Sequence, residues 1–72
     1  MSQAIDLVRV RRLVSTGVAR EVRQEAGLSL AEMANAVGVH RMTVHKWERG
    51  RHRPKGDAAL RYAHVLDELM QR

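Results

Sequence analysis

The chain has 72 residues, 44% of them hydrophobic and 29% charged, which is typical of a folded domain with one small core and excludes a disordered tail or an elaborate multidomain enzyme. It contains no cysteine, which excludes disulfides and thiolate metal sites. Its apolar runs are too short for a membrane span or a signal peptide, so we expect a cytoplasmic protein, and its formal net charge is +5.

The first part of the chain predicts two helices. Apolar residues recur at three- and four-residue spacings from Gln3 to Val14 and predict an amphipathic helix with three arginines outside. These arginines are Arg9, Arg11 and Arg12. We expect the segment Ser15-Thr16-Gly17 to break the chain and to cap a second helix that starts at Val18, and we expect Gly27 to end that helix.

The middle of the chain predicts two short helices with a tight turn between them. Ser29-Leu30-Ala31-Glu32 is a capping box, so a helix should begin at Leu30 and end at Gly38. Its core-facing residues are expected to be Leu30, Met33, Ala34 and Val37. A second helix follows from Arg41 to about Arg49, with Val44 and Trp47 facing inward, and Gly50 ends it. Such a pair, over residues 29–50, has the pattern of a helix-turn-helix unit.

The last part of the chain predicts a basic loop over residues 51–56 and a long final helix over residues 56–71. We expect Asp57 to cap this helix as an acidic residue at its start. Its apolar face is expected to comprise Ala59, Leu60, Ala63, Leu66, Leu69 and Met70. No segment has the pattern of a strand, so the fold class is all-α: a compact bundle of about five short helices forming one domain over residues 1–72, in which segment 1–15 covers the core or forms a subunit contact.

The positive charge is concentrated in one segment. Between His40 and Lys55 there are six basic residues and only one acid, Glu48, whereas the rest of the chain holds seven basic and seven acidic residues. The six are Arg41, Lys46, Arg49, Arg51, Arg53 and Lys55. A basic stripe confined to one segment is the electrostatic pattern of a nucleic-acid-binding surface.

Three strings in this region resemble a known family. They are Gly27-Leu28-Ser29-Leu30-Ala31-Glu32-Met33-Ala34, Val37-Gly38-Val39, and Thr43-Val44-His45-Lys46-Trp47-Glu48-Arg49-Gly50. The chain is similar, from about Val18 to Leu69, to the lambda-type phage repressor and Cro family of helix-turn-helix proteins, also called the XRE family. The resemblance implies a lambda repressor-like fold and a Cro-like repressor that occupies operator DNA as a homodimer in a bacterial cell or phage-infected host.

The resemblance places base contacts at the start and on the outer face of the second helix of the pair. Carried onto this chain, the base-reading positions are His40, Arg41, Met42, His45 and Lys46. Arg41 can donate two hydrogen bonds to guanine, and its alternative role is a phosphate clamp. His40 stands where a capping serine is usual, so its imidazole either caps the helix or faces DNA.

Phosphate contacts are expected around these positions. Ser29 offers a hydroxyl and a helix start to a phosphate, and Thr43 faces phosphate or supports the first turn. The remaining expected phosphate contacts are Arg51, Arg53 and Lys55. Three residues are assigned structural support: Trp47 as a core anchor, and Glu48 paired with Arg23, as the resemblance implies.

Other functions have less support in the sequence. An antitoxin would use the same DNA surface and add a toxin as protein partner, and an interaction module would bind protein or RNA on the same fold. The basic segment carries too few apolar residues to insert into a membrane surface. The scattered positions of His40, His45, His52 and His64 predict no metal site, and we expect no cofactor and no catalytic residues, because neither a triad nor a paired-carboxylate pattern is present.

Overall fold

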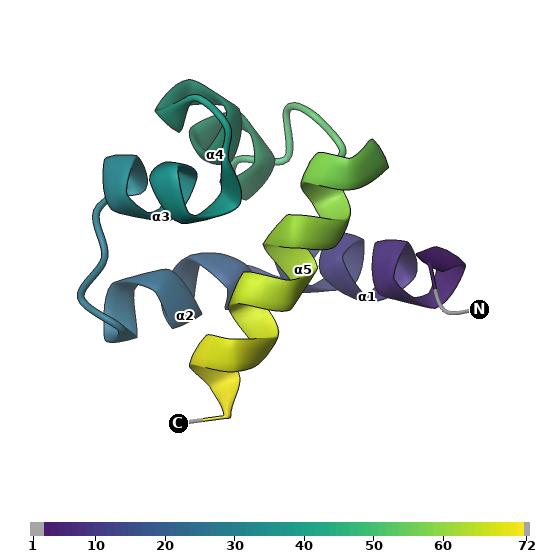
Figure 1. The fold of residues 1–72 in the computed structure, drawn as a ribbon, viewed down its shortest axis with the longest axis horizontal. Helices are drawn as coiled ribbons and strands as arrows, with labels where there is room; N and C mark the ends of the chain where they lie inside the picture. Colours follow the sequence, from purple (N-terminus) through teal and green to yellow (C-terminus); the bar gives the residue numbers. More distant parts are fainter. Residues whose placement is uncertain (1–2, 72) are drawn as a thin grey trace.

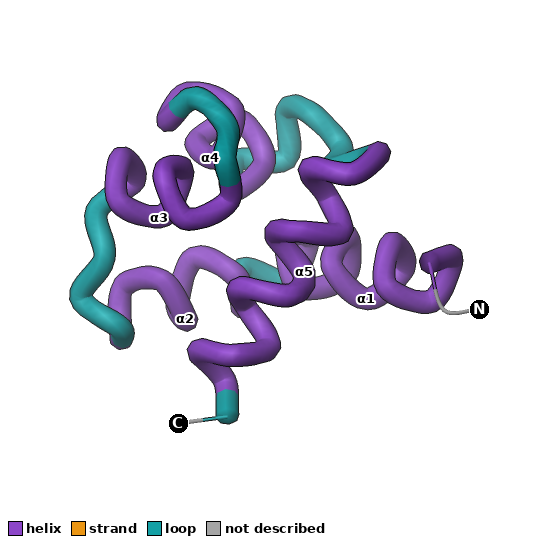
Figure 2. Tube along the Cα trace, in the orientation of Figure 1, coloured by secondary structure: helices purple, strands orange, loops and turns teal. Residues whose placement is uncertain are grey.

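The computed structural model describes residues 3–71, which form five helices joined by short connections (Figures 1 and 2). The helices are α1 (Gln3–Ser15), α2 (Val18–Glu25), α3 (Leu30–Val37), α4 (Arg41–Glu48) and α5 (Gly56–Met70). No strand occurs within residues 3–71. The prediction of an all-α bundle with a helix-turn-helix pair is confirmed.

Helix α5 organises the bundle because it packs against α1, α2 and α3. Figure 1 shows α5 crossing in front of the other helices, with the α3–α4 pair on one side and α1 and α2 on the other. The buried core draws on all five helices. Its members are Val10, Val14, Ala19, Met33, Ala34, Val37, Val44, Trp47, Ala59, Tyr62, Ala63 and Leu66. Within residues 3–71, no helix combines the length and apolarity that crossing a membrane requires.

The residues that cap the two ends of α3 are as predicted. The Ser29 hydroxyl accepts a hydrogen bond from the Glu32 N–H at 3.0 Å, and the Glu32 carboxylate accepts one from the Ser29 N–H at 2.8 Å. At the other end Gly38 adopts a left-handed conformation with φ +85°, which a residue with a Cβ rarely adopts. This glycine allows the chain to turn directly from α3 toward α4.

The predicted start of α2 is confirmed, and the predicted cap of α5 is wrong. The N-cap of α2 is Gly17, within the predicted break, while the Ser15 and Thr16 hydroxyls donate to the Arg12 carbonyl at the end of α1. Short hydroxyl side chains near a helix end reach the carbonyls of the preceding turn, and here that bond prevails. Helix α5 begins one residue before Asp57, so this acid lies in the first turn and Lys55 holds the N-cap position without a side-chain bond.

The apolar face of α5 differs from prediction at several positions. Leu60 is only half-buried and is not among the residues that pack against the buried core. Met70 is 48% exposed, because the last turn of α5 runs beyond the core and borders an open hollow of about 650 Å³ beside the end of α2. Tyr62, which the periodicity did not assign to the core, is fully buried and stacks on Trp47 with ring centroids 4.7 Å apart. The aromatic pair therefore joins α4 to α5.

The role of the N-terminal helix can now be described. Val10 and Val14 of α1 are buried in the core, so one face of α1 covers it. On the same helix Ile5 and Val8 are 65% and 57% exposed. Helix α1 therefore contributes to the core and also presents apolar surface to solvent.

Candidate nucleic-acid interface

The α3–α4 pair is held in place by the inward side of α4. Val44 is fully buried and Trp47 is 4% exposed, and both pack in the core with Met33 and Val37 of α3. Helical periodicity places Met42, His45 and Lys46 on the opposite side of α4. The buried pair therefore fixes which side of α4 is available to a ligand.

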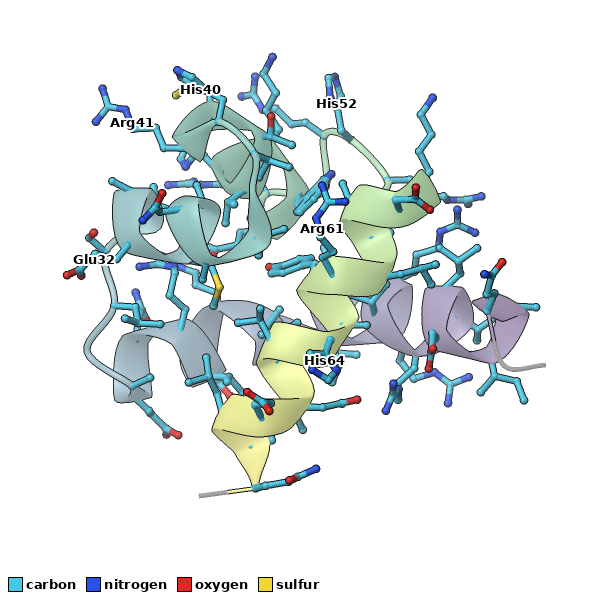
Figure 3. All side chains as sticks on the ribbon, in the orientation of Figure 1. Glu32, His40, Arg41, His52, Arg61 and His64 are labelled. Atoms are coloured by element: carbon cyan, nitrogen blue, oxygen red, sulfur yellow. The ribbon has the colours of Figure 1, made fainter. Side chains whose placement is uncertain are left out.

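His40 caps α4. Its imidazole Nδ1 accepts a hydrogen bond from the Met42 N–H at 3.1 Å, so the structure decides between the two roles left open by the sequence in favour of the cap. A neutral imidazole that accepts at Nδ1 carries its hydrogen on Nε2, which remains a donor. Figure 3 shows His40 and Arg41 together at the outer end of α4, pointing away from the body of the molecule.

The predicted base-reading residues lie on one helix and differ in exposure. Arg41 and Met42 are exposed, whereas His45 and Lys46 are half-buried. Among the residues that the structure describes, Arg41 forms no ion pair, so its guanidinium keeps all its donors. Met42 presents only apolar atoms and a thioether, which suit contact with a thymine methyl group rather than hydrogen bonding.

The predicted phosphate contacts fall into two places. Ser29 is engaged in the α3 capping box, so the Glu32 carboxylate already occupies the helix start that was expected to receive a phosphate. The other four residues border one open hollow of about 550 Å³ beside α4, together with Trp47 and His52. They are Thr43, Arg51, Arg53 and Lys55, and none of the described residues that line the hollow is acidic.

The loop that carries these cations is anchored at Pro54, whose side chain is fully buried. Its carbonyl accepts a hydrogen bond from the Arg11 Nε at 2.9 Å. Arg51, His52, Arg53 and Lys55 are exposed around this anchor, and Figure 3 shows His52 pointing outward from the loop. No local pattern in so polar a segment predicts a buried proline.

The only acid of the basic segment is neutralised inside the protein. Arg23 Nε donates to Glu48 Oε2 at 2.6 Å, and Arg23 Nη2 donates to Glu48 Oε1 at 3.0 Å. The side chains are 10% and 3% exposed, respectively. The hydrogen bond that Arg23 donates to Glu48 raises the pKa of Arg23, so this guanidinium stays protonated. The solvent-facing surface of segment 40–55 therefore carries basic side chains and no carboxylate.

Arg61 is a supporting residue that sequence reasoning missed. Its Nε donates to the Val37 carbonyl at 2.7 Å, at the end of α3. The guanidinium lies against Gly38, 3.6 Å from where a Cβ would stand. Figure 3 shows Arg61 reaching from α5 toward the α3–α4 turn. No local sequence pattern indicates an arginine that donates a hydrogen bond to a carbonyl 24 residues away.

The histidines do not gather. Figure 3 shows His64 on α5, away from His40 at the start of α4. Within residues 3–71, no group of three or more metal-ligating side chains lies close enough to hold a metal ion. The arrangement thus presents an outward-facing helix with donors at its start and a cationic loop beside it, which together can hydrogen-bond and neutralise a polyanion.

Comparison with known proteins adds to this geometry. A family model described as "Helix-turn-helix" matches residues 20–69, which leaves α1 outside the match. Two relatives carry the name "Putative HTH-type transcriptional regulatory protein": one from Pyrococcus abyssi is 35% identical over 51 residues, or 71% of this chain, and one from Pyrococcus furiosus is 37% identical over 49 residues, or 68% of it. The chain spans 16% of the length of each relative. No solved structure matches the chain.

Proposed function

Because this chain belongs to the helix-turn-helix family, and to its XRE type, we propose that it is a transcriptional regulator that binds double-stranded DNA in a sequence-specific manner through α4. The observation that carries the proposal is the cationic surface around α4, in which the only acid, Glu48, is buried against Arg23. The major groove of B-DNA is about 12 Å wide and admits one α-helix.

The exposed start of α4 supports base reading by this helix. Arg41 reads guanine with two hydrogen bonds, and Met42 contacts a thymine methyl group. His45 and Lys46 contact bases one turn further along, and His40 Nε2 supplies one more donor while Nδ1 caps the helix. Arg51, Arg53, Lys55 and Thr43 hold phosphates beside the groove, and the Ser29 hydroxyl, whose oxygen caps α3, adds a weaker contact through its hydrogen.

The regulator is proposed to act as a homodimer. One short recognition helix reads few base pairs, and two-fold related copies reach half-sites that lie about 34 Å apart. Ile5 and Val8 of α1 supply exposed apolar surface for contact between the two copies. Bound across an operator, such a dimer represses transcription by excluding polymerase, as a Cro-like repressor does, and it does so in the cytoplasm, where bacterial or phage DNA lies.

A second candidate, the antitoxin of a toxin–antitoxin pair, rests on the same exposed residues of α1. In that case Ile5 and Val8 contact a toxin rather than a second copy of the chain. Sedimentation of the purified protein distinguishes the two hypotheses. A wild-type protein with the mass of a dimer and a Val8→Lys variant with the mass of a monomer support the homodimer. A monomer in both proteins favours the antitoxin.

The test of the function is selection of binding sites from random duplex DNA at physiological salt, with excess nonspecific competitor. An enriched palindrome with half-sites about one helical turn apart supports a dimeric operator-binding protein. A single enriched half-site keeps sequence-specific binding and removes the dimer. No enrichment overturns the proposal and leaves an interaction module for RNA or protein. Arg41→Ala, carried through the same selection, shows whether enrichment depends on α4.

A further inference from the structure

Arg11 and Arg12 of α1 are cations without a carboxylate partner among residues 3–71. This contrasts with Arg9 on the same helix, which binds both Asp6, at 2.8 Å, and Asp67, at 2.9 Å. Outside the basic segment the numbers of basic and acidic residues are equal, but not every basic side chain has an acidic partner in the structure. Two positive charges are left together near the end of α1.

Arg11 connects α1 to the basic loop. Its Nε donates to the carbonyl of Pro54, a residue with a fully buried side chain, so the guanidinium is held against a fixed part of the loop. Both terminal nitrogens of Arg11 are free of protein hydrogen bonds in the described structure and remain available as donors. A guanidinium already held in place loses little side-chain freedom when it binds a ligand.

The two arginines meet the loop across an open hollow of about 400 Å³. Arg11, Arg12, His52 and Arg53 line it, and none of its lining residues is acidic. His52 and Arg53 also line the hollow on the α4 side of the loop. The cationic surface therefore continues from α4 across the loop to α1, a helix outside the part of the chain that the family model matches.

The end of α1 does not repel an anion as strongly as a bare helix end would. Helix C-termini carry partial negative charge on unpaired carbonyls. Here the Arg12 carbonyl accepts from the N–H of Thr16 at 3.0 Å and from its hydroxyl at 2.8 Å, and the Val14 carbonyl accepts from the Gly17 N–H at 3.2 Å. These bonds leave the arginine charges dominant in the hollow.

We propose that Arg11, Arg12 and Arg53 form a phosphate-binding site between α1 and the basic loop, and that a DNA backbone phosphate beside the bases faced by α4 fills it. The source of the phosphate rests on the proposed function; the site itself does not. Helix α1 then extends the DNA-binding surface beyond the helix-turn-helix unit. In this site the guanidinium groups donate charge-assisted hydrogen bonds to the phosphate oxygens.

The test compares Arg12→Gln with Arg20→Gln. Arg12 makes no side-chain hydrogen bond in the described structure, and Arg20, an exposed arginine of α2, lines neither hollow, so both changes remove one surface charge. Affinity for a mixed-sequence duplex of about 30 base pairs, or three helical turns, is measured against salt concentration. In Arg12→Gln the slope of log affinity against log salt should become shallower by about 0.9 per protein bound. In Arg20→Gln the slope should stay at the wild-type value. In Arg12→Lys, which restores the charge, the slope should return to the wild-type value.

A second measurement follows the Arg11 and Arg12 Nε–H signals by NMR during titration with inorganic phosphate at constant ionic strength. Saturable shifts that Arg12→Gln weakens support the site even if the wild-type protein binds no duplex, a result that would overturn the proposed function alone. Saturable shifts with an unchanged salt slope overturn the DNA contact and assign the site to free phosphate. Equal behaviour of Arg12→Gln and Arg20→Gln in both measurements overturns the site.

Discussion

Arg23 of α2 and Glu48 at the end of α4 form a bidentate ion pair across 25 residues of sequence, with distances of 2.6 and 3.0 Å. Arg23 also donates to the Leu28 carbonyl at 2.9 Å, so one side chain joins α2, the loop that follows it and α4. The pair removes the negative charge of Glu48 from the cationic surface and fixes the end of α4.

Breaking this pair should destabilise the fold before it alters DNA preference. Glu48→Ala leaves Arg23 buried without its carboxylate, and stranding one partner of a buried pair costs about 3 to 5 kcal/mol. The free energy of unfolding is measured in urea by Trp47 fluorescence and circular dichroism. Glu25→Ala removes an exposed acid from the end of α2 and serves as the control for charge. Equal stability of the two variants would contradict a stabilising role for the pair.

Tyr62 supplies a second stability prediction. Its hydroxyl is buried and has no hydrogen-bond partner among residues 3–71, and burial, assisted by the negative charge of Glu48, raises its pKa above the ordinary value of 10.0. Tyr62→Phe removes the unsatisfied hydroxyl and keeps the ring stacked on Trp47, so stability near neutral pH should stay equal or rise.

The pH dependence of Tyr62 has a definite sign. A group with a raised pKa in the folded state favours the protonated form, so its contribution is complete below pH 10 and is lost as the pH rises above that value. The melting temperature of the wild type should therefore fall more steeply above pH 10 than that of Tyr62→Phe. Because Tyr62 is the only tyrosine, tyrosinate absorbance reports its ionisation directly. If the melting temperatures of the two proteins fall equally with pH above 10, Tyr62 does not resist ionisation.

Local signals in the sequence predicted most helix boundaries and the inward side of α4. The Ser29–Glu32 capping box, Gly38 and the spacing of Val44 and Trp47 each act within one or two helical turns, so a single segment contains the whole signal. Arg61 on the Val37 carbonyl and Arg11 on the Pro54 carbonyl depend on helices that meet only after folding. Such contacts have no period or motif, which is why the sequence did not predict these two hydrogen bonds.

His40 allows capping to be separated from DNA contact. His40→Ala should cost about 0.5 to 2 kcal/mol of stability, because the Met42 N–H loses its acceptor, whereas His40→Ser keeps an acceptor oxygen and should remain near the wild type. Thermal unfolding checks this order. If the imidazole also donates to a base, both variants lose the same preference at one position of the selected DNA site. Equal stability of both variants would contradict the cap.

Arg41 and Arg53 test the proposed division between base reading and phosphate binding. Both are exposed, and each is replaced by alanine, so the two variants lose the same charge. Arg41→Ala should cost about 1 to 3 kcal/mol on the selected site and relax preference at one base pair, because a bidentate contact with guanine is lost. Arg53→Ala should weaken binding to all sequences alike and reduce the salt slope by about 0.9 per phosphate contact.

Binding of both variants is measured on the selected site and on single-base variants of it at several salt concentrations. The same loss on every sequence for both variants would assign Arg41 to the phosphate backbone, and sequence preference would then have to come from Met42, His45, Lys46 or the shape of the duplex.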